Sequence, residues 1–291
     1  MIGDLLDDVL QRISTLSEKD MVRILVALHD AFQERDIQIY LEDAALQTEV
    51  QAFRWSGEIQ AVDDGQDYLM AVNTNLQGGK SDAKIQQTIQ YSATVSDDGT
   101  IIGTAVIERT HTGQEGEPLY GLNNVSYLRL YVPEGSELLD AGGFTFPAED
   151  AFFVPEDWYG DSTHLADYEK EEGVHIGSGT RVTREFGKTA FGNWVMTPPG
   201  RTSKVFFTYR LPFRLWEERN VPKKDALASY VLFIQKQSGT HDNVRSAVSF
   251  SSSWSPRWVS KEGVRMSEHG VEEDGAMTED RFMSVIMKKD F

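Results

Sequence analysis

The spacing of apolar residues changes after about sixty positions, from the period of a helix to the period of a strand. In residues 1–55, apolar side chains recur every three or four positions, which predicts amphipathic helices. Ser17, with Asp20 three positions on, is typical of a helix start, and Glu42 or Asp43 can cap a third helix that runs to Phe53. Between the second and third helices, residues 37–41 predict a short strand.

Strict alternation of apolar and polar residues begins near residue 84. In residues 85–95 every second residue belongs to one face, and that face is apolar except for Gln87. The turn Asp97-Asp98-Gly99 and a second alternating segment, 101–109, complete the pattern of a β-hairpin. A compact apolar run at 68–72 predicts a buried strand ahead of it. Further strands are predicted at 126–132, 144–146, 180–185, 189–197, 204–209, 230–235, 244–250 and 282–287.

These elements predict an α+β fold: an N-terminal helical segment followed by a mainly antiparallel β-sandwich. We place the boundary so that residues 1–83 form a helix-rich α/β segment, part of a domain that is incomplete here. Residues 84–291 then form the sandwich. Residues 149–173 hold nine acidic residues and one lysine, and they predict an acidic loop between strands.

Charge and composition exclude several classes of partner and chemistry. Asp and Glu number 46 against 28 Lys and Arg, for a net charge of −18, which disfavours binding to nucleic acid and to anionic lipid. The absence of cysteine excludes disulfides, thiolate metal sites and cysteine nucleophiles. No apolar run approaches the roughly 20 residues that span a bilayer, and no signal-peptide pattern opens the chain.

No motif in the sequence predicts a catalytic or cofactor-binding residue. The six histidines never pair at the spacing of zinc ligands, and the Gly-x-Ser-x-Gly pattern of a nucleophile elbow does not occur. Residues 78–81 read Gly-Gly-Lys-Ser, but the first glycine of a phosphate loop is replaced by Thr74. The carboxylates are too numerous for the sequence to select a glycosidase pair.

Two acidic clusters and one aromatic pair are the candidate sites. Carboxylate oxygens at loop spacing suit calcium, although neither cluster has the EF-hand pattern. The candidate calcium ligands are Asp63, Asp64, Asp67, Glu156, Asp157 and Asp161. Solvated acidic loops are the alternative. Trp158 and Tyr159, beside these carboxylates, could bind a sugar by stacking and hydrogen bonding, with packing as the alternative.

The order of several segments resembles bacterial proteins of the domain-of-unknown-function family 4012. The resemblance covers about residues 20–290 and is carried by the segments 41–47, 54–57, 67–69, 73–75, 79–82, 127–133 and 235–240. It implies an ectodomain outside the cytoplasmic membrane, in a parent protein anchored by one N-terminal transmembrane helix. The present chain begins without such a helix, so the resemblance implies a C-terminal ectodomain portion. The family supplies no activity or catalytic residue.

We therefore expect a non-enzymatic, extracytoplasmic module of the cell envelope that binds a surface polysaccharide or a partner protein. This expectation includes no nucleic acid, no membrane contact by the chain itself and no cofactor except possible calcium. The alternative is an envelope glycan-processing enzyme whose active site lies partly upstream. A cleft with converging carboxylates and an arginine such as Arg54 or Arg129 would favour the enzyme. Arg129, however, alternates with Leu128 and Leu130, which indicates a structural role.

Overall fold

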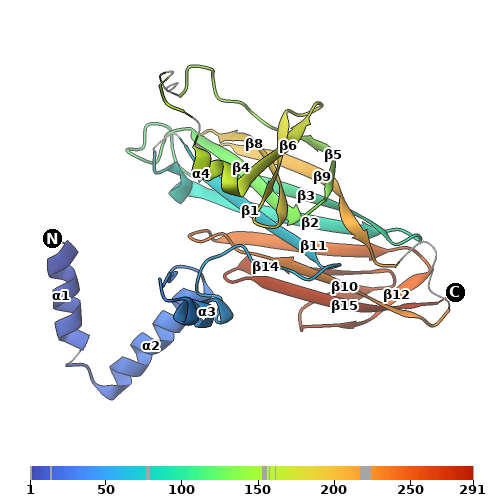
Figure 1. The fold of residues 1–291 in the computed structure, drawn as a ribbon, viewed down its shortest axis with the longest axis horizontal. Helices are drawn as coiled ribbons and strands as arrows, with labels where there is room; N and C mark the ends of the chain where they lie inside the picture. The colour runs from blue at the N-terminus through green and yellow to red at the C-terminus, as the bar shows by residue number, and fades with distance from the viewer. Residues whose placement is uncertain are drawn as a thin grey trace. The chain divides into compact units, whose positions relative to one another are not determined.

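A computed structural model describes residues 2–13, 15–76, 79–152, 156, 158–160, 162–216 and 224–290. The chain separates into two compact units, Met1–Glu58 and Ile59–Phe291. The predicted boundary at 83/84 is corrected to 58/59, because the strand at Asp67–Asn75 is paired within a sheet of the second unit. The fold is mostly β (Figure 1).

The first unit contains three helices at the places that the apolar spacing predicts. They are α1 (Ile2–Ile13), α2 (Glu18–Gln33) and α3 (Ala44–Ala52). The Ser17 hydroxyl accepts the Asp20 amide as N-cap of α2, and the Asp43 carboxylate accepts two amides as N-cap of α3. The predicted strand at 37–41 is wrong: the segment is not assigned to a strand, and Ile39 makes one backbone hydrogen bond to Trp55.

The second unit consists of two mixed sheets. The first has the strand order β12-β15-β10-β1-β4-β8-β7-β6, and the second has the order β13-β14-β11-β2-β3-β9-β5. The strands are β1 (Asp67–Asn75), β2 (Ile85–Val95), β3 (Thr100–His111), β4 (Asn124–Pro133), β5 (Glu137–Gly142), β6 (Glu169–His175), β7 (Thr180–Glu185), β8 (Lys188–Thr197), β9 (Thr202–Arg214), β10 (Leu227–Ile234), β11 (Asp242–Phe250), β12 (Trp254–Val259), β13 (Arg265–Ser267), β14 (Gly270–Met277) and β15 (Arg281–Lys289).

The prediction of a mainly antiparallel sandwich is corrected, because each sheet contains a parallel pair. β1 runs parallel to β10 in the first sheet, and β2 runs parallel to β11 in the second. A parallel pair needs a long crossover, and here the crossovers carry the chain from one sheet to the other. Alternation within a strand shows which face is buried, but it does not show which distant strand lies alongside.

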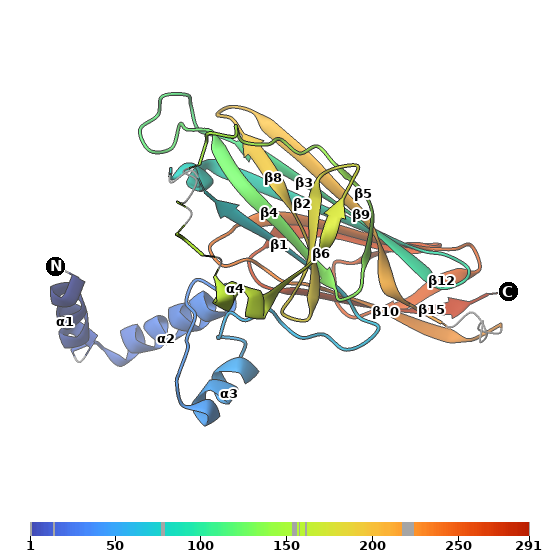
Figure 2. The same ribbon diagram turned by 45° about the horizontal axis from the view of Figure 1, so that its top comes forward.

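The two sheets have a sandwich-like arrangement (Figures 1 and 2). The larger of two hydrophobic clusters among the described residues contains side chains from both sheets. The inward residues of β2 and β3 follow the predicted alternation, with Ile89 and Ile107 buried as cross-strand partners. Phe191 of the first sheet stacks on Phe207 of the second, with ring centroids 6.3 Å apart. The predicted hairpin at 85–95 and 101–109 is confirmed as β2 and β3.

Two predicted segments, the strand at 144–146 and the loop at 149–173, differ from the structure. Residues 144–146 are not a strand; the neighbouring strand is β5, which pairs with β9 through a bulge. Within the predicted acidic loop at 149–173, Thr163–Tyr168 is the helix α4, and the acidic segment that follows is β6. β6 lies at the edge of its sheet, where charged side chains can remain in solvent.

Candidate functional site

The strongest candidate site is a polar pocket of about 410 Å³ where several strands end together, which we call the end pocket. It lies at the end of β1 and β3 and at the start of β2 and β11, and the 3₁₀ turn η1 (Ser81–Lys84) contributes to its wall. Its principal polar lining residues are Asn73, Asp82, Gln87, Arg109, Thr240 and Asp242. Its volume is within the range of small-molecule sites.

Arg109 is the central residue of the end pocket. It occupies an inward position near the end of β3, and only 2% of its surface is exposed. One terminal guanidinium nitrogen donates to Gln87 at 3.0 Å, and the other donates to Asp82 at 3.1 Å and to Asn124 at 3.0 Å. Burial lowers the pKa of Arg109, and the negative charge of Asp82 opposes that shift, so the guanidinium remains a cation.

A second chain of hydrogen bonds connects the pocket to Asp242. The Gln87 side chain accepts from Arg109 and from Asn73, and it donates to the Asp242 carboxylate at 3.1 Å. Burial is the main cause that raises the pKa of Asp242, and hydrogen bonding by Gln87 opposes it. The pocket therefore holds a fixed cation, a carboxylate at Asp82 that is paired with it and a second carboxylate, Asp242, whose pKa is raised by burial.

Two polar atoms at this site have no hydrogen-bond partner among the described residues. They are the Arg109 Nε and the Asn73 Oδ1, a donor and an acceptor. Buried polar atoms are normally paired, because leaving one unpaired costs about 1–3 kcal/mol. These two atoms are themselves buried, so the hydrogen bonding of the network is incomplete within the described part of the protein.

The loops around the pocket are held by further side-chain hydrogen bonds. The backbone amide of Asn73 donates to the Gln237 side chain at 2.8 Å, and the backbone carbonyl of Asn73 accepts from the same side chain at 2.9 Å. The Asn75 side chain donates to the Gly79 carbonyl at 3.2 Å. Segments 73–75, 79–82 and 235–240, which are far apart in sequence, thus all contribute residues at or beside one pocket.

The sequence-predicted calcium residues are not brought together in the first cluster. Asp63 and Asp64 are exposed, whereas Asp67 is buried and its carboxylate accepts hydrogen bonds from Tyr91 and Tyr230. In the second cluster, Glu156 is described, and Asp157 and Asp161 lie outside the described residues. The described residues contain no group of three potential metal ligands. Calcium binding stays a prediction from the sequence.

The aromatic pair is placed on the surface. Trp158 and Tyr159 are 72% and 64% exposed, with ring centroids 4.2 Å apart. The Trp158 indole donates to Glu156 at 2.5 Å, which fixes the ring beside a carboxylate. Packing in the core does not explain these two rings, so they remain available to a ligand.

Arg129 has the structural role that its strand position indicates. It donates to Glu185 at 3.2 Å, and Tyr131 donates to the same carboxylate at 2.6 Å. The pocket arginine is instead Arg109, which the sequence reasoning missed. The available signal was a polar pair on the apolar face of the predicted hairpin, because Gln87 is the cross-strand partner of Arg109.

Comparisons with known proteins give only weak structural likenesses. No protein-family model and no curated protein matches the sequence. Among solved structures, a "putative nutrient binding protein" from Legionella pneumophila is 8% identical, with a TM-score of 0.40 over 76% of this chain and 71% of that chain. An M1 zinc metallopeptidase from Deinococcus radiodurans is 11% identical, with a TM-score of 0.27 over 70% of this chain.

The chain spans 42% of that metallopeptidase. Because these TM-scores are low, neither likeness supports an argument about function. In the described part of the chain, no helix combines the length and apolar character that crossing a bilayer requires.

Proposed function

We propose that this protein is a non-enzymatic, extracytoplasmic module of the cell envelope that binds one saccharide unit of a surface polymer in the end pocket. The observation that supports the proposal is the buried Arg109 network, which presents donors and acceptors around a space of about 410 Å³. A sugar ring carries hydroxyl groups that both donate and accept hydrogen bonds, so its binding site needs both donors and acceptors among the lining residues. The parent protein is membrane-anchored in this proposal.

The balance of charge in the pocket favours a neutral, hydroxyl-rich ligand. Arg109 is already neutralised by Asp82, and its terminal nitrogens are used by three neighbours. The remaining polar side chains are amides, the hydroxyls of Ser238 and Thr240, the His241 imidazole and the Asp242 carboxylate, which suit hydroxyl groups better than a free anion. A partner protein would instead need a broad contact surface of the usual interface size.

Co-sedimentation with isolated cell-envelope fractions tests this function. The proposal predicts saturable pelleting of the purified chain, and soluble polysaccharide released from the same fraction should compete with it. Parallel samples with calcium and with a chelator separate this binding from any contribution of the acidic loops. Pelleting that the polysaccharide does not reduce would contradict saccharide binding and favour a surface protein.

The second candidate is an envelope glycan-processing enzyme. The observation in its favour is that Asp82 and Asp242 line one pocket in different environments, since Asp82 is paired with Arg109 and Asp242 has a raised pKa. Glycosidases use two carboxylates that differ in this way as acid and base or nucleophile. Release of new reducing ends from envelope glycan, lost in Asp242→Asn, would establish the enzyme. Binding without release would favour the module.

A further inference from the structure

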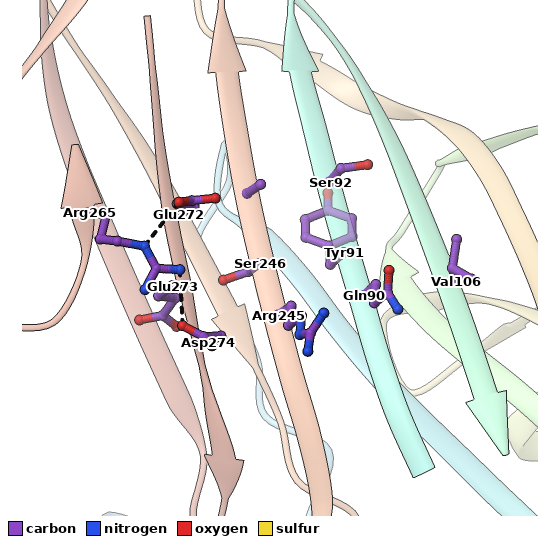
Figure 3. Close-up of a pocket in the computed structure, with 11 residues that line it drawn as sticks. Gln90, Tyr91, Ser92, Val106, Arg245, Ser246, Arg265, Glu272, Glu273 and Asp274 are labelled. Atoms are coloured by element: carbon purple, nitrogen blue, oxygen red, sulfur yellow. Dashed lines mark hydrogen bonds and ion pairs between the residues drawn. The ribbon is translucent and has the colours of Figure 1, made fainter. Parts of the chain in front are cut away.

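The outer face of the second sheet carries a separate groove of about 380 Å³ across β14, β11, β2 and β3, which we call the face groove (Figure 3). It is lined on this face by Gln90, Ser92, Val106, Arg245, Ala247 and Arg265. The end pocket shares none of these residues. Short side chains at Ser92 and Ala247 leave the hollow between longer neighbours.

Strand register places a cation, an amide and an apolar side chain in one row across the groove. Arg245 of β11 is the partner of Gln90 on β2, and Gln90 is the partner of Val106 on β3. Side chains of directly paired residues lie on the same face of a sheet. A ligand along this row would meet a charge at one end and an apolar contact at the other.

A fixed ion-pair cluster bounds the groove beside Arg245. Arg265 donates to Glu272 at 2.9 Å and binds Asp274 at 3.0 Å, as the dashed lines in Figure 3 show. Asp274 is the cross-strand partner of Arg245, but its carboxylate is engaged by Arg265. Arg245 itself makes no ion pair with any residue in the described ranges. Its guanidinium is exposed and open to an external anion.

We propose that the face groove binds the carboxylate of an acidic saccharide through Arg245. The planar guanidinium matches a carboxylate with two parallel hydrogen bonds. Gln90 and Ser92 beside it can bond the hydroxyl groups of the same sugar, and Val106 can contact the ring. A phosphate dianion fits less well, because Glu272 and Asp274 lie at the same groove and repel the additional charge.

The net charge of −18 does not prevent this local contact. At physiological ionic strength the Debye length is about 8 Å, so distant surface carboxylates are largely screened from a ligand at Arg245. Arg265 pairs with both Glu272 and Asp274, so its single charge offsets only one of these two carboxylates. With Arg245 the charges at the groove balance, so a simple anion gains little there, and an acidic saccharide gains from hydroxyl groups that bond Gln90 and Ser92 beside the guanidinium.

Calorimetric titration with galacturonate tetrasaccharide tests the proposal, with its methyl ester as the matched ligand that has the same rings and no charge. The wild-type chain should bind the acid, and the ester should bind at least about tenfold more weakly. Arg245→Gln should weaken acid binding by a similar factor. Arg210→Gln, which removes an exposed arginine paired with Glu137 on the same sheet, should leave it unchanged.

Three results would overturn the proposal: no binding of the acid by the wild-type chain, equal binding of acid and ester, or equal weakening by Arg245→Gln and Arg210→Gln. Tetraglutamate distinguishes a peptide from a sugar, and equal affinity for it would overturn the saccharide assignment. Asp242→Asn separates this inference from the proposed function, because that change should affect the end pocket alone. Thermal unfolding of each variant confirms that the groove is still folded.

Discussion

The Asp67 carboxylate on β1 accepts a hydrogen bond from the Tyr91 hydroxyl on β2, so a polar contact joins the two sheets through their shared core. Tyr230 of β10 donates to the same oxygen, and the Tyr68 amide donates to the other at 2.8 Å. Both phenols are fully buried. A carboxylate in this position has hydrogen bonds but no described cation beside it.

Asp67→Asn should remove a pH dependence of stability. Burial raises the pKa of Asp67 from 3.8 to about 6, so the folded chain binds this proton more tightly than the unfolded chain. The associated stability is complete below pH 3.8 and is lost as pH rises through 6, a loss of about 3 kcal/mol.

Urea unfolding at pH 4.5 and pH 7.5 measures this effect as the difference in unfolding free energy between the wild-type chain and Asp67→Asn. Relative to the wild-type chain, the variant should have a higher free energy of unfolding at pH 7.5 than at pH 4.5. Asp140→Asn, an exposed aspartate on β5, is the control and should show no such trend. A difference between Asp67→Asn and the wild-type chain that is the same at both pH values would refute a buried, titrating Asp67.

Arg109→Met should destabilise the second unit. The change leaves the acceptor oxygens of Gln87 and Asn124 without their shared donor inside the protein. The expected cost in unfolding free energy is about 1–3 kcal/mol, because buried polar groups lose a hydrogen-bond partner, whereas the partly exposed Asp82 can be hydrated. Arg210→Met breaks an exposed pair and should cost at most about 1 kcal/mol. Equal losses in urea unfolding would argue against a special role for the buried network.

Gly103→Ala should disturb the contact between the two sheets. A Cβ at Gly103 would lie 2.8 Å from the Tyr91 hydroxyl and 3.1 Å from the Tyr209 ring, and both side chains are buried. Overpacking of this kind costs about 1–3 kcal/mol. Gly160→Ala is the matched control, since no atom of the described residues lies within 4 Å of the added carbon. If the two variants melt at the same temperature, the close packing around Tyr91 is not as described.

Trp158→Ala with Tyr159→Ala should separate ligand contact from stability. Both rings are mostly exposed, so the unfolding free energy should change by less than about 0.5 kcal/mol. If the pair contributes to saccharide binding, retention on immobilised envelope glycan should fall sharply. Retention equal to that of the wild-type chain would show that these two rings, which do not line the end pocket, make no contribution to glycan binding.

The sequence predicts local elements better than their pairing. Apolar spacing identifies α2, and the alternation around Asp97-Asp98-Gly99 identifies β2 and β3 with their inward faces. It does not reveal that β10 lies parallel to β1, because that contact joins residues far apart in sequence. β14 was missed for a local reason: it carries Glu272, Glu273 and Asp274 in succession, which hides its apolar face.

The candidate site was less accessible to sequence reasoning than the fold. Asp67 belongs to an acidic cluster in the sequence, yet β1 directs its carboxylate into the core. Arg109 has no motif around it, and only its pairing with Gln87 on an apolar face marks it as unusual. Asp242 belongs to the same network, although it lies 155 positions after Gln87 in the sequence. Such a site becomes visible only after the strands are placed in register.

The most direct test of the end pocket is co-sedimentation of Asp242→Asn and Asp140→Asn with envelope fractions, beside the wild-type chain. Both variants remove one carboxylate charge, but only Asp242 lines the pocket. Asp242→Asn should weaken the affinity for the envelope fraction, read from the saturation curve, at least about tenfold, which corresponds to one lost hydrogen bond to a charged group. Asp140→Asn should pellet like the wild-type chain. Equal pelleting of all three would contradict binding at the end pocket.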